Sequence, residues 1–156
     1  MPKPNDAGVG TAVFILNEKG EILLMLRKGA HRAGHWAVPG GWIDRLDPST
    51  NISAIREVKE ETGIEVRRLH HVGWTSEDHP KLGVRSISLY HVALPGEWEG
   101  DPRIMEPHKC EELRWFDLQD LPETTFPGLT DAVSTLILWQ FERRLVEADR
   151  EGWSNE

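Results

Sequence analysis

Three glutamates within five positions of one another are the most concentrated source of chemistry in this chain. They are Glu57, Glu60 and Glu61, in the stretch REVKEETG at residues 56–63. The sequence predicts a helix over residues 51–62, and at about 100° per residue the three carboxylates fall within one arc roughly 100° wide. The apolar residues of this segment lie on another side, at Ile52, Ile55 and Val58. The predicted helix therefore has one face to bury and one acidic face to present.

The cost of crowding these carboxylates depends on where the acidic face points. On a solvated helix each like-charge pair costs about 0.2–0.5 kcal/mol, and Arg56 and Lys59 offer compensation. In a cleft, two carboxylates about 5.5 Å apart repel by on the order of 3 kcal/mol at an effective dielectric near 20, and a bound cation would turn that repulsion into attraction. Carboxylate oxygens favour Mg²⁺, Mn²⁺ or Ca²⁺. The Pro-Gly-Gly turn at residues 39–41 favours the cleft, because glycine permits close approach of a ligand or metal.

The elements that must position this helix follow from apolar patterning and turn residues. Residues 8–17 and 21–27 predict two strands paired as a hairpin, and residues 28–44 predict a loop with a short strand at 36–38. Ser49, Thr50 and Asn51 offer capping side chains for the helix, and Gly63 is suited to its left-handed C-cap. Further predicted elements are strands at 66–74, 84–94 and 113–117, a long polar loop at 95–112, and a helix at 130–148 with Val133, Leu136, Ile137 and Leu145 on one stripe. This order predicts an α/β fold with a mixed sheet covered on both faces.

Composition narrows the class of protein. The 156 residues are most simply one domain, 1–156, with an ordered core over about 8–148. Apolar runs are too short to span a bilayer and the first residues do not resemble a secretory signal, so a cytoplasmic protein is expected. The single cysteine, Cys110, excludes an internal disulfide and predicts a structural thiol. A net charge of −8 disfavours binding of a nucleic acid polymer.

From Gly41 the chain reads GWIDRLDPSTNISAIREVKEETGI, which resembles the Nudix box. The second half of the box matches at Arg56, Glu57, Val58, Glu60, Glu61, Gly63 and Ile64. The first half departs, because Asp47 stands where the family has glutamate and one extra residue precedes Arg56. Residues 105–122 are similar to a late segment of the Nudix nucleoside triphosphate diphosphatases. The resemblance implies a Nudix α/β/α sandwich with the mixed sheet between helices.

The resemblance also implies roles for individual residues. Glu57, Glu60 and Glu61 would be ligands of Mg²⁺ or Mn²⁺, with the Gly40 carbonyl as a further ligand. Arg56 would orient the glutamates, and one of these glutamates or Glu111 on the long loop would accept the proton from water.

Substrate contacts are expected at four positions around the Pro-Gly-Gly turn and the strand before it. Arg27 matches a phosphate contact of the related diphosphatases, and His35 and Trp36 lie just ahead of the turn, where tryptophan offers a stacking face for a base. Gly41 allows close approach of the ligand. For Arg27 the alternative is a surface charge, and for Trp36 it is core packing.

Three functions stay open on the sequence. The first is Mg²⁺-dependent hydrolysis of a (d)NTP to a monophosphate and pyrophosphate. The second keeps the chemistry but changes the substrate to ADP-ribose, another dinucleotide or a prenyl diphosphate, and the third is a nucleotide-binding module without turnover. The expected partner is a small nucleotide or diphosphate, with no membrane, and the resemblance makes a homodimer a candidate assembly. Neither a dinucleotide fingerprint nor a P-loop is present in the sequence.

Overall fold

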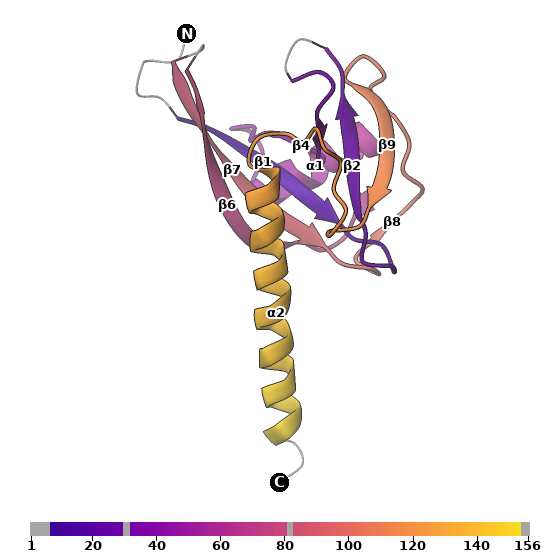
Figure 1. The fold of residues 1–156 in the computed structure, drawn as a ribbon, viewed down its shortest axis with the longest axis vertical. Coiled ribbons are helices and arrows are strands. Elements are labelled where there is room, and N and C mark those ends of the chain that lie inside the picture. Colours follow the sequence, from indigo (N-terminus) through magenta and orange to yellow (C-terminus); the bar gives the residue numbers. More distant parts are fainter. Residues whose placement is uncertain (1–6, 30–31, 81–82, 154–156) are drawn as a thin grey trace.

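The computed structural model describes residues 7–29, 32–80 and 83–153 (Figure 1). Residues 30 and 31 of the loop predicted at 28–44, and the outermost terminal residues, lie outside the described part. The helices are α1 (Thr50–Thr62) and α2 (Leu129–Trp153). The strands are β1 (Ala7–Ile15), β2 (Ile22–Arg27), β3 (Trp36–Ala37), β4 (Gly40–Trp42), β5 (Glu65–Val66), β6 (His70–His79), β7 (Val84–Ala93), β8 (Trp98–Glu99) and β9 (Cys110–Phe116).

The largest sheet is mixed, in the order β4-β1-β7-β6. β1 lies in its interior, parallel to β7 and antiparallel to β4, with Ala12 opposite both Tyr90 and Gly40. A second sheet has the order β3-β2-β9, and β5 pairs with β8. The prediction of an α/β fold with a mixed sheet is confirmed.

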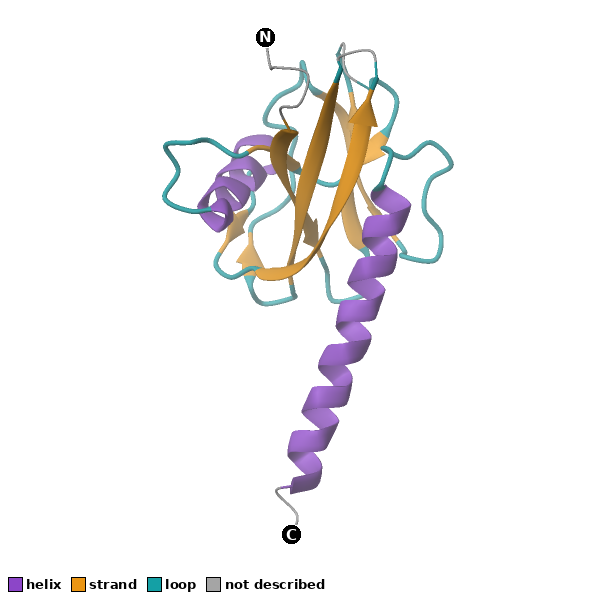
Figure 2. Ribbon diagram, turned by 90° about the vertical axis from the view of Figure 1, so that its left-hand side faces the viewer, coloured by secondary structure: helices purple, strands orange, loops and turns teal. Residues whose placement is uncertain are grey.

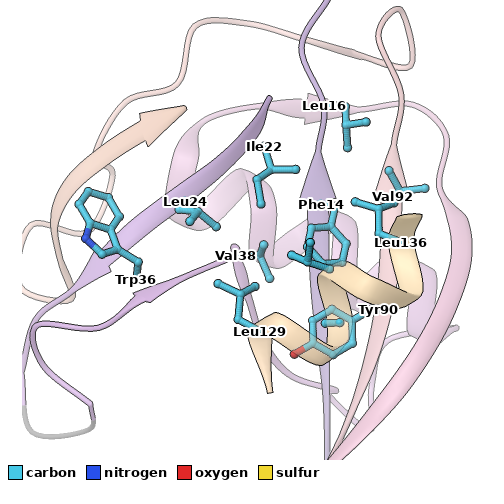
Figure 3. Packing of buried hydrophobic residues seen from close by; sticks show 12 residues of the cluster. Phe14, Leu16, Ile22, Leu24, Trp36, Val38, Tyr90, Val92, Leu129 and Leu136 are labelled. Carbon is cyan, nitrogen blue, oxygen red and sulfur yellow. The ribbon is translucent and has the colours of Figure 1, made fainter. Parts of the chain in front are cut away.

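Two apolar clusters lie on opposite sides of β1 and β2, because side chains alternate along a strand. Phe14, Ile22 and Leu24 pack with Leu129 and Leu136 of α2 (Figure 3). Val13, Ile15 and Leu23 pack with Ala54 and Val58 of α1. The two helices are therefore held on different faces of the strands that carry the site.

The caps of α1 are those predicted from the sequence. The Ser49 side chain accepts a hydrogen bond from the Ile52 N–H at 3.3 Å, which satisfies one of the unpaired donors of the first turn. Gly63, at φ 73°, ends the helix in the left-handed conformation and donates its N–H to the Lys59 carbonyl. These caps fix the start and end of the segment that carries the three glutamates.

Several strand predictions need correction. The prediction that β1 and β2 pair as a hairpin was wrong, because the two strands belong to different sheets. A Leu16–Ile22 bridge and the hydrogen bond from the Asn17 N–H to the Glu21 carbonyl join them near the turn, whereas β1 pairs with β7 and β2 with β9. The strand expected at 66–74 is divided between β5 and β6, and β6 continues to His79. The last strand begins at Cys110 and β8 lies inside the expected loop. Periodicity identifies a strand but carries no information on which strand it pairs with.

The last helix also differs from its prediction. α2 begins at Leu129 and reaches Trp153, five residues beyond the expected end. Of the predicted stripe, Val133 and Leu136 are buried, whereas Ile137 and Leu145 are exposed. Figures 1 and 2 show why, since the C-terminal part of α2 extends away from the sheets. No helix in the described ranges has the length and apolar content needed to span a membrane.

Candidate active site

A cavity of about 420 Å³ opens beside the Pro-Gly-Gly turn, between β1, β4, β7 and the side chains of α1. Its walls carry three kinds of group, two carboxylates, two cations and several aromatic or hydroxyl side chains. The residues that matter for its chemistry are Glu57, Glu61, Arg27, Lys109, Trp42, Phe126, Tyr90, His79, Ser86 and Ser88. Such a concave site with a few convergent polar groups is the usual form of a ligand pocket.

Glycines at the turn allow α1 to place its carboxylates in this cavity. The Gly40 N–H donates a hydrogen bond of 2.8 Å to Oε2 of Glu61. A Cβ atom at Gly41 would lie 2.5 Å from Cδ of Glu57, and one at Gly40 would lie 2.2 Å from the Thr11 carbonyl oxygen. A larger residue at Gly41 would therefore displace the Glu57 carboxylate, and one at Gly40 would clash with the backbone of β1.

Glu61 is a buried acid, and its surroundings disfavour the charged form. The pKa of Glu61 is raised to about 8, chiefly by burial and in part by the neighbouring Glu57, and the hydrogen bond from Gly40 opposes the shift. A cation between Glu57 and Glu61 would offset both the burial and the mutual repulsion. In the ranges that the structure describes, no three His, Cys, Asp or Glu side chains form a ready-made metal site. The residues still fit a hard divalent cation, because two oxygen donors face one cavity and further positions would be filled by water or substrate.

The Arg56 guanidinium pairs with three carboxylates and links them to one another. Its guanidinium donates from Nη1 to Glu57 at 2.9 Å and to Glu60 at 3.1 Å. Nε and Nη2 both donate to Oδ2 of Asp47 at 3.1 Å. The pKa of Arg56 is raised by Asp47 and then by Glu57, so the guanidinium is charged throughout the accessible range.

Asp47 is fixed from a second direction. Oγ of Ser53 donates to its Oδ2 at 2.7 Å, and the hydrogen bonds from Ser53 and Arg56 lower the pKa of Asp47. The shorter acid and the extra residue in the preceding loop thus still bring a carboxylate to Arg56. Because that carboxylate holds one end of the guanidinium, the other end is left to orient Glu57 and Glu60.

The other predicted site residues divide into two groups. Arg27 and Gly41 line the cavity, and the Arg27 guanidinium lies 5.5 Å from the ring centre of Phe126. Trp36 is buried in the core against Phe116, as in the packing alternative. His35 and Glu111 are not among the lining residues. Glu60 is half exposed and reaches the site only through Arg56.

Comparison with known proteins decides the family. A family model described as NUDIX domain matches residues 6–136 of the chain. The chain belongs to the Nudix family. A solved Nudix neighbour, titled a MutT NUDIX hydrolase from Burkholderia pseudomallei, has a TM-score of 0.77 and 32% identity, covering 83% of this chain and 98% of that one.

Relatives of this Nudix protein include two enzymes that are named for different substrates. NAD-capped RNA hydrolase NudC of Pseudomonas putida is 26% identical over 117 residues, which are 73% of this chain and 38% of the relative. ADP-ribose pyrophosphatase of Methanocaldococcus jannaschii is 31% identical over 115 residues, which are 72% of this chain and 63% of the relative. The chain thus spans well under half of NudC and less than two thirds of the pyrophosphatase.

The sequence did not single out several residues that line the Nudix cavity. Trp42 at the end of β4 is 62% exposed, and it faces the cavity where Trp36 does not. His79 and Ser86 are joined by a hydrogen bond of 2.8 Å across β6 and β7. The only available signal was the alternation of Val84, Ser86, Ser88 and Tyr90 along one strand face, which marks a shared side but not a cavity.

Glu106 is a further carboxylate near the site that the sequence did not single out. It accepts a hydrogen bond of 2.8 Å from Nζ of Lys109, which lines the cavity. Its charge also contributes to the raised pKa of Glu61. Glu106 is therefore a better placed acid of the long loop than Glu111.

Proposed function

We propose that the protein hydrolyses a nucleoside diphosphate linked to a further group, with a (d)NTP as first candidate and a monophosphate and pyrophosphate as products. The observation that carries this proposal is that carboxylates and aromatic side chains line the same cavity. Glu57 and Glu61 are the carboxylates, and Trp42, Phe126 and Tyr90 are the aromatic residues of its walls. A phosphate chain needs charge compensation and a base needs a stacking surface, and this cavity offers both.

The carboxylates of the cavity would hold the cofactor, Mg²⁺ or Mn²⁺. Glu57 and Glu61 are the first candidate ligands, with Glu60 and the Gly40 carbonyl as the further ligands implied by the family. When bound, the cation neutralises charge that develops on the transferred phosphoryl group. Arg56 keeps Glu57 and Glu60 in place through its own pairing with Asp47.

Two cations of the chain can hold the phosphates against the acidic surface of the molecule. Arg27 and Lys109 both line the cavity. Lys109 is fixed by Glu106, which raises the pKa of Lys109 and keeps the ammonium group charged. A phosphate chain that contacts these cations and a metal ion on the cavity carboxylates would be positioned for attack by water.

The general base stays open between the cavity glutamates and an acid of the long loop. Glu61 is the best placed of the first group, since it lies in the cavity and already accepts the Gly40 N–H. Glu106 replaces Glu111 as the candidate from the loop because of its link to Lys109. Single Glu→Gln variants at positions 57, 61 and 106, compared by their pH–rate profiles, distinguish these assignments.

A second substrate class, ADP-ribose or another dinucleotide, is favoured by the 31% identity to the M. jannaschii enzyme. Cavity size argues for the triphosphate, because about 420 Å³ is near the small end of the roughly 300–1,000 Å³ of ligand pockets and suits one nucleoside better than two. Capped RNA is disfavoured by the net charge of −8. A prenyl diphosphate would not use the hydroxyl groups of Ser86 and Ser88. A cytoplasmic location stays a prediction.

The deciding experiment measures phosphate products from a panel of (d)NTPs, oxidised dGTP, ADP-ribose and geranyl diphosphate, with Mg²⁺ and with Mn²⁺. We expect the highest kcat/KM for a triphosphate, with pyrophosphate as product. Faster turnover of ADP-ribose would move the assignment to the dinucleotide class. Nucleotide binding by calorimetry without turnover of any substrate would leave a binding module, and both catalytic proposals would fail.

A further inference from the structure

The C-terminal part of α2, residues 137–153, carries a feature that the hydrolase does not use. The family match ends at residue 136, and Leu136 is the last fully buried side chain of the helix. From residue 141 to residue 152 every side chain except Arg143 is exposed. We call residues 137–153 the α2 extension. It projects from the body in both views of the fold (Figures 1 and 2).

Apolar side chains of the extension gather on the side away from the body. The face toward the body continues from Ala132, Val133 and Leu136 to a groove that Arg68 and His70 share with Trp139, Arg143 and Val146. At about 100° per residue, Leu138, Phe141 and Leu145 point roughly opposite to that face. These three side chains are 56%, 59% and 55% exposed. We call them, with Ile137 beside them, the outer stripe.

An outer stripe of this kind is unexpected on a helix that stands alone. Most helical stability in proteins comes from packing of one apolar face. The extension has such a face and no element of the described chain covers it. The body cannot cover it either, because it lies on the opposite side of the helix.

Spacing and charge identify what fits the outer stripe. Leu138, Phe141 and Leu145 follow the three-and-four spacing of a coiled-coil seam, and Ala148 continues it. In a parallel pair, Arg144 beside the seam meets Asp149 of the second copy, and symmetry repeats this attraction. In an antiparallel pair with Phe141 against Leu145, Arg144 would face Arg144 and Glu142 would face Glu142. The flanking charges therefore favour a parallel arrangement.

We infer that the outer stripe is a dimer surface, and that its occupant is the α2 extension of a second copy of this chain in parallel orientation. Both bodies then lie on the outer sides of the helix pair, clear of each other's seam. The extension is about 24 Å long at about 1.5 Å per residue, so the contact belongs to the small class of interfaces and a micromolar dissociation constant is expected.

Sedimentation velocity over a dilution series tests the surface with two matched variants. Leu145→Glu places a charge in the seam, whereas Val146→Glu makes the same change one residue later at 52% exposure, on the side of the groove. Glutamate is a good helix former, so far-UV circular dichroism should be alike for both. We expect the wild type and Val146→Glu to dimerise, and Leu145→Glu to raise the dissociation constant by at least about tenfold.

Orientation is tested by crosslinking. Identical seam positions meet in a parallel pair, so oxidised Leu145→Cys should form an interchain disulfide and Val146→Cys should not. Cys110 is buried and present in both variants, which makes it an internal control. A wild type that stays monomeric at the highest concentration, or a dimer that survives Leu145→Glu, overturns the inference. A dimer without the Leu145→Cys crosslink overturns the parallel arrangement.

Discussion

α1 and α2 both depart from the usual pattern of burial, since α1 buries a carboxylate and α2 exposes apolar side chains. α1 directs Glu57 and Glu61 into a cavity, where burial and the neighbouring Glu57 work against a charge on Glu61. α2 packs Leu129 and Leu136 into the core but then exposes Phe141 and Leu145 to solvent. A buried charge calls for a cation, and an exposed apolar stripe calls for an apolar partner. Each helix is thus incomplete in a way that its own chemistry specifies.

The difference also separates what each helix contributes. The acidic face of α1 is held by named hydrogen bonds from Arg56 and Gly40, within the part of the chain that matches the family. The α2 extension lies beyond the match, where Trp139 lies 5.4 Å from the His70 ring centre and the outer stripe is exposed. Changes in α1 should therefore act on turnover, and changes in the extension should act on association.

The largest expected effect is that of Glu61→Gln on turnover. The amide oxygen can still accept the Gly40 N–H, but the cavity loses a carboxylate, so kcat/KM should fall by about 10²–10³-fold, as for removal of one preorganised electrostatic group. The midpoint of thermal unfolding without metal should be unchanged or higher, because the variant no longer buries an acid whose ionisation the site disfavours.

The control for Glu61→Gln is Glu65→Gln, which removes an exposed carboxylate paired with Lys59 outside the cavity. Its activity should stay within about twofold of the wild type, as for surface substitutions in general. Equal activities for Glu61→Gln and the wild type would show that α1 does not carry the chemistry.

Within α2, a pair of leucine substitutions should divide the helix at the end of the family match. Leu136→Ala removes a fully buried side chain and should lower the free energy of unfolding by about 2–5 kcal/mol. Leu138→Ala, two residues later and 56% exposed, should change it by less than about 0.5 kcal/mol when measured in the monomer. Urea unfolding at low protein concentration measures both. A large loss for Leu138→Ala in the monomer would mean that the body, and not a second copy, covers the outer stripe.

A smaller effect on turnover is expected from Asp47→Asn, which loosens Arg56 without touching the cavity. The amide cannot pair with the guanidinium as a charge, so Glu57 and Glu60 lose orientation, and the Mg²⁺ concentration for half activation should rise by about 10–100-fold. Asp47→Glu should recover part of the loss, because it restores the charge. Asp44→Asn, an exposed acid in the same loop, should leave metal activation unchanged. A KM for nucleotide that rises by about 10–100-fold, with unchanged metal activation, would assign Asp47 to substrate binding instead.

The sequence predicted the parts of the site that depend on local spacing. Helix caps at Ser49 and Gly63 and the acidic arc of α1 follow from neighbours a few residues apart. The glycine turn also followed from its residues, but its close approach to Glu57 could be seen only in the fold. The mixed sheet followed from the order of elements.

Long-range placement could not be predicted in the same way. Trp36 and Trp42 flank the same turn, yet β3 and β4 belong to different sheets, so one ring packs in the core and the other faces the cavity. Glu111 and Glu106 lie on one loop, but only the path of that loop brings Glu106 to Lys109. The stripe of α2 was read as core throughout, because periodicity does not say where the body ends.

The smallest expected effect concerns a second titratable group buried on the α1 side of the sheet. His91 lies on the same face of β7 as Ala93, which packs with α1, and its Nδ1 is 3.2 Å from Oγ1 of Thr11. Burial and the nearby His71 lower the pKa of His91 below its ordinary 6.5. Below pH 6.5 the unfolded chain binds this proton first, so stability is complete above that pH and falls as the pH drops toward the folded pKa. The slope for one proton is at most about 1.4 kcal/mol per pH unit.

His91→Gln, which cannot titrate, should flatten the pH dependence of urea unfolding below pH 6.5. The measurement needs a dilute monomer, so that association through the α2 extension does not contribute. Glu97 differs from His91, because its surroundings favour the charged form. Burial raises the pKa of Glu97, but the hydrogen bonds from Leu94 and His70 lower it more. Its contribution is lost only as the pH falls below about 4.5, so the two groups act in separate windows. If the free energy of unfolding of His91→Gln depends on pH between 6.5 and 5 as that of the wild type does, protonation of His91 does not destabilise the fold. In that case only Glu57 and Glu61 distinguish the α1 side of the sheet from the apolar α2 side.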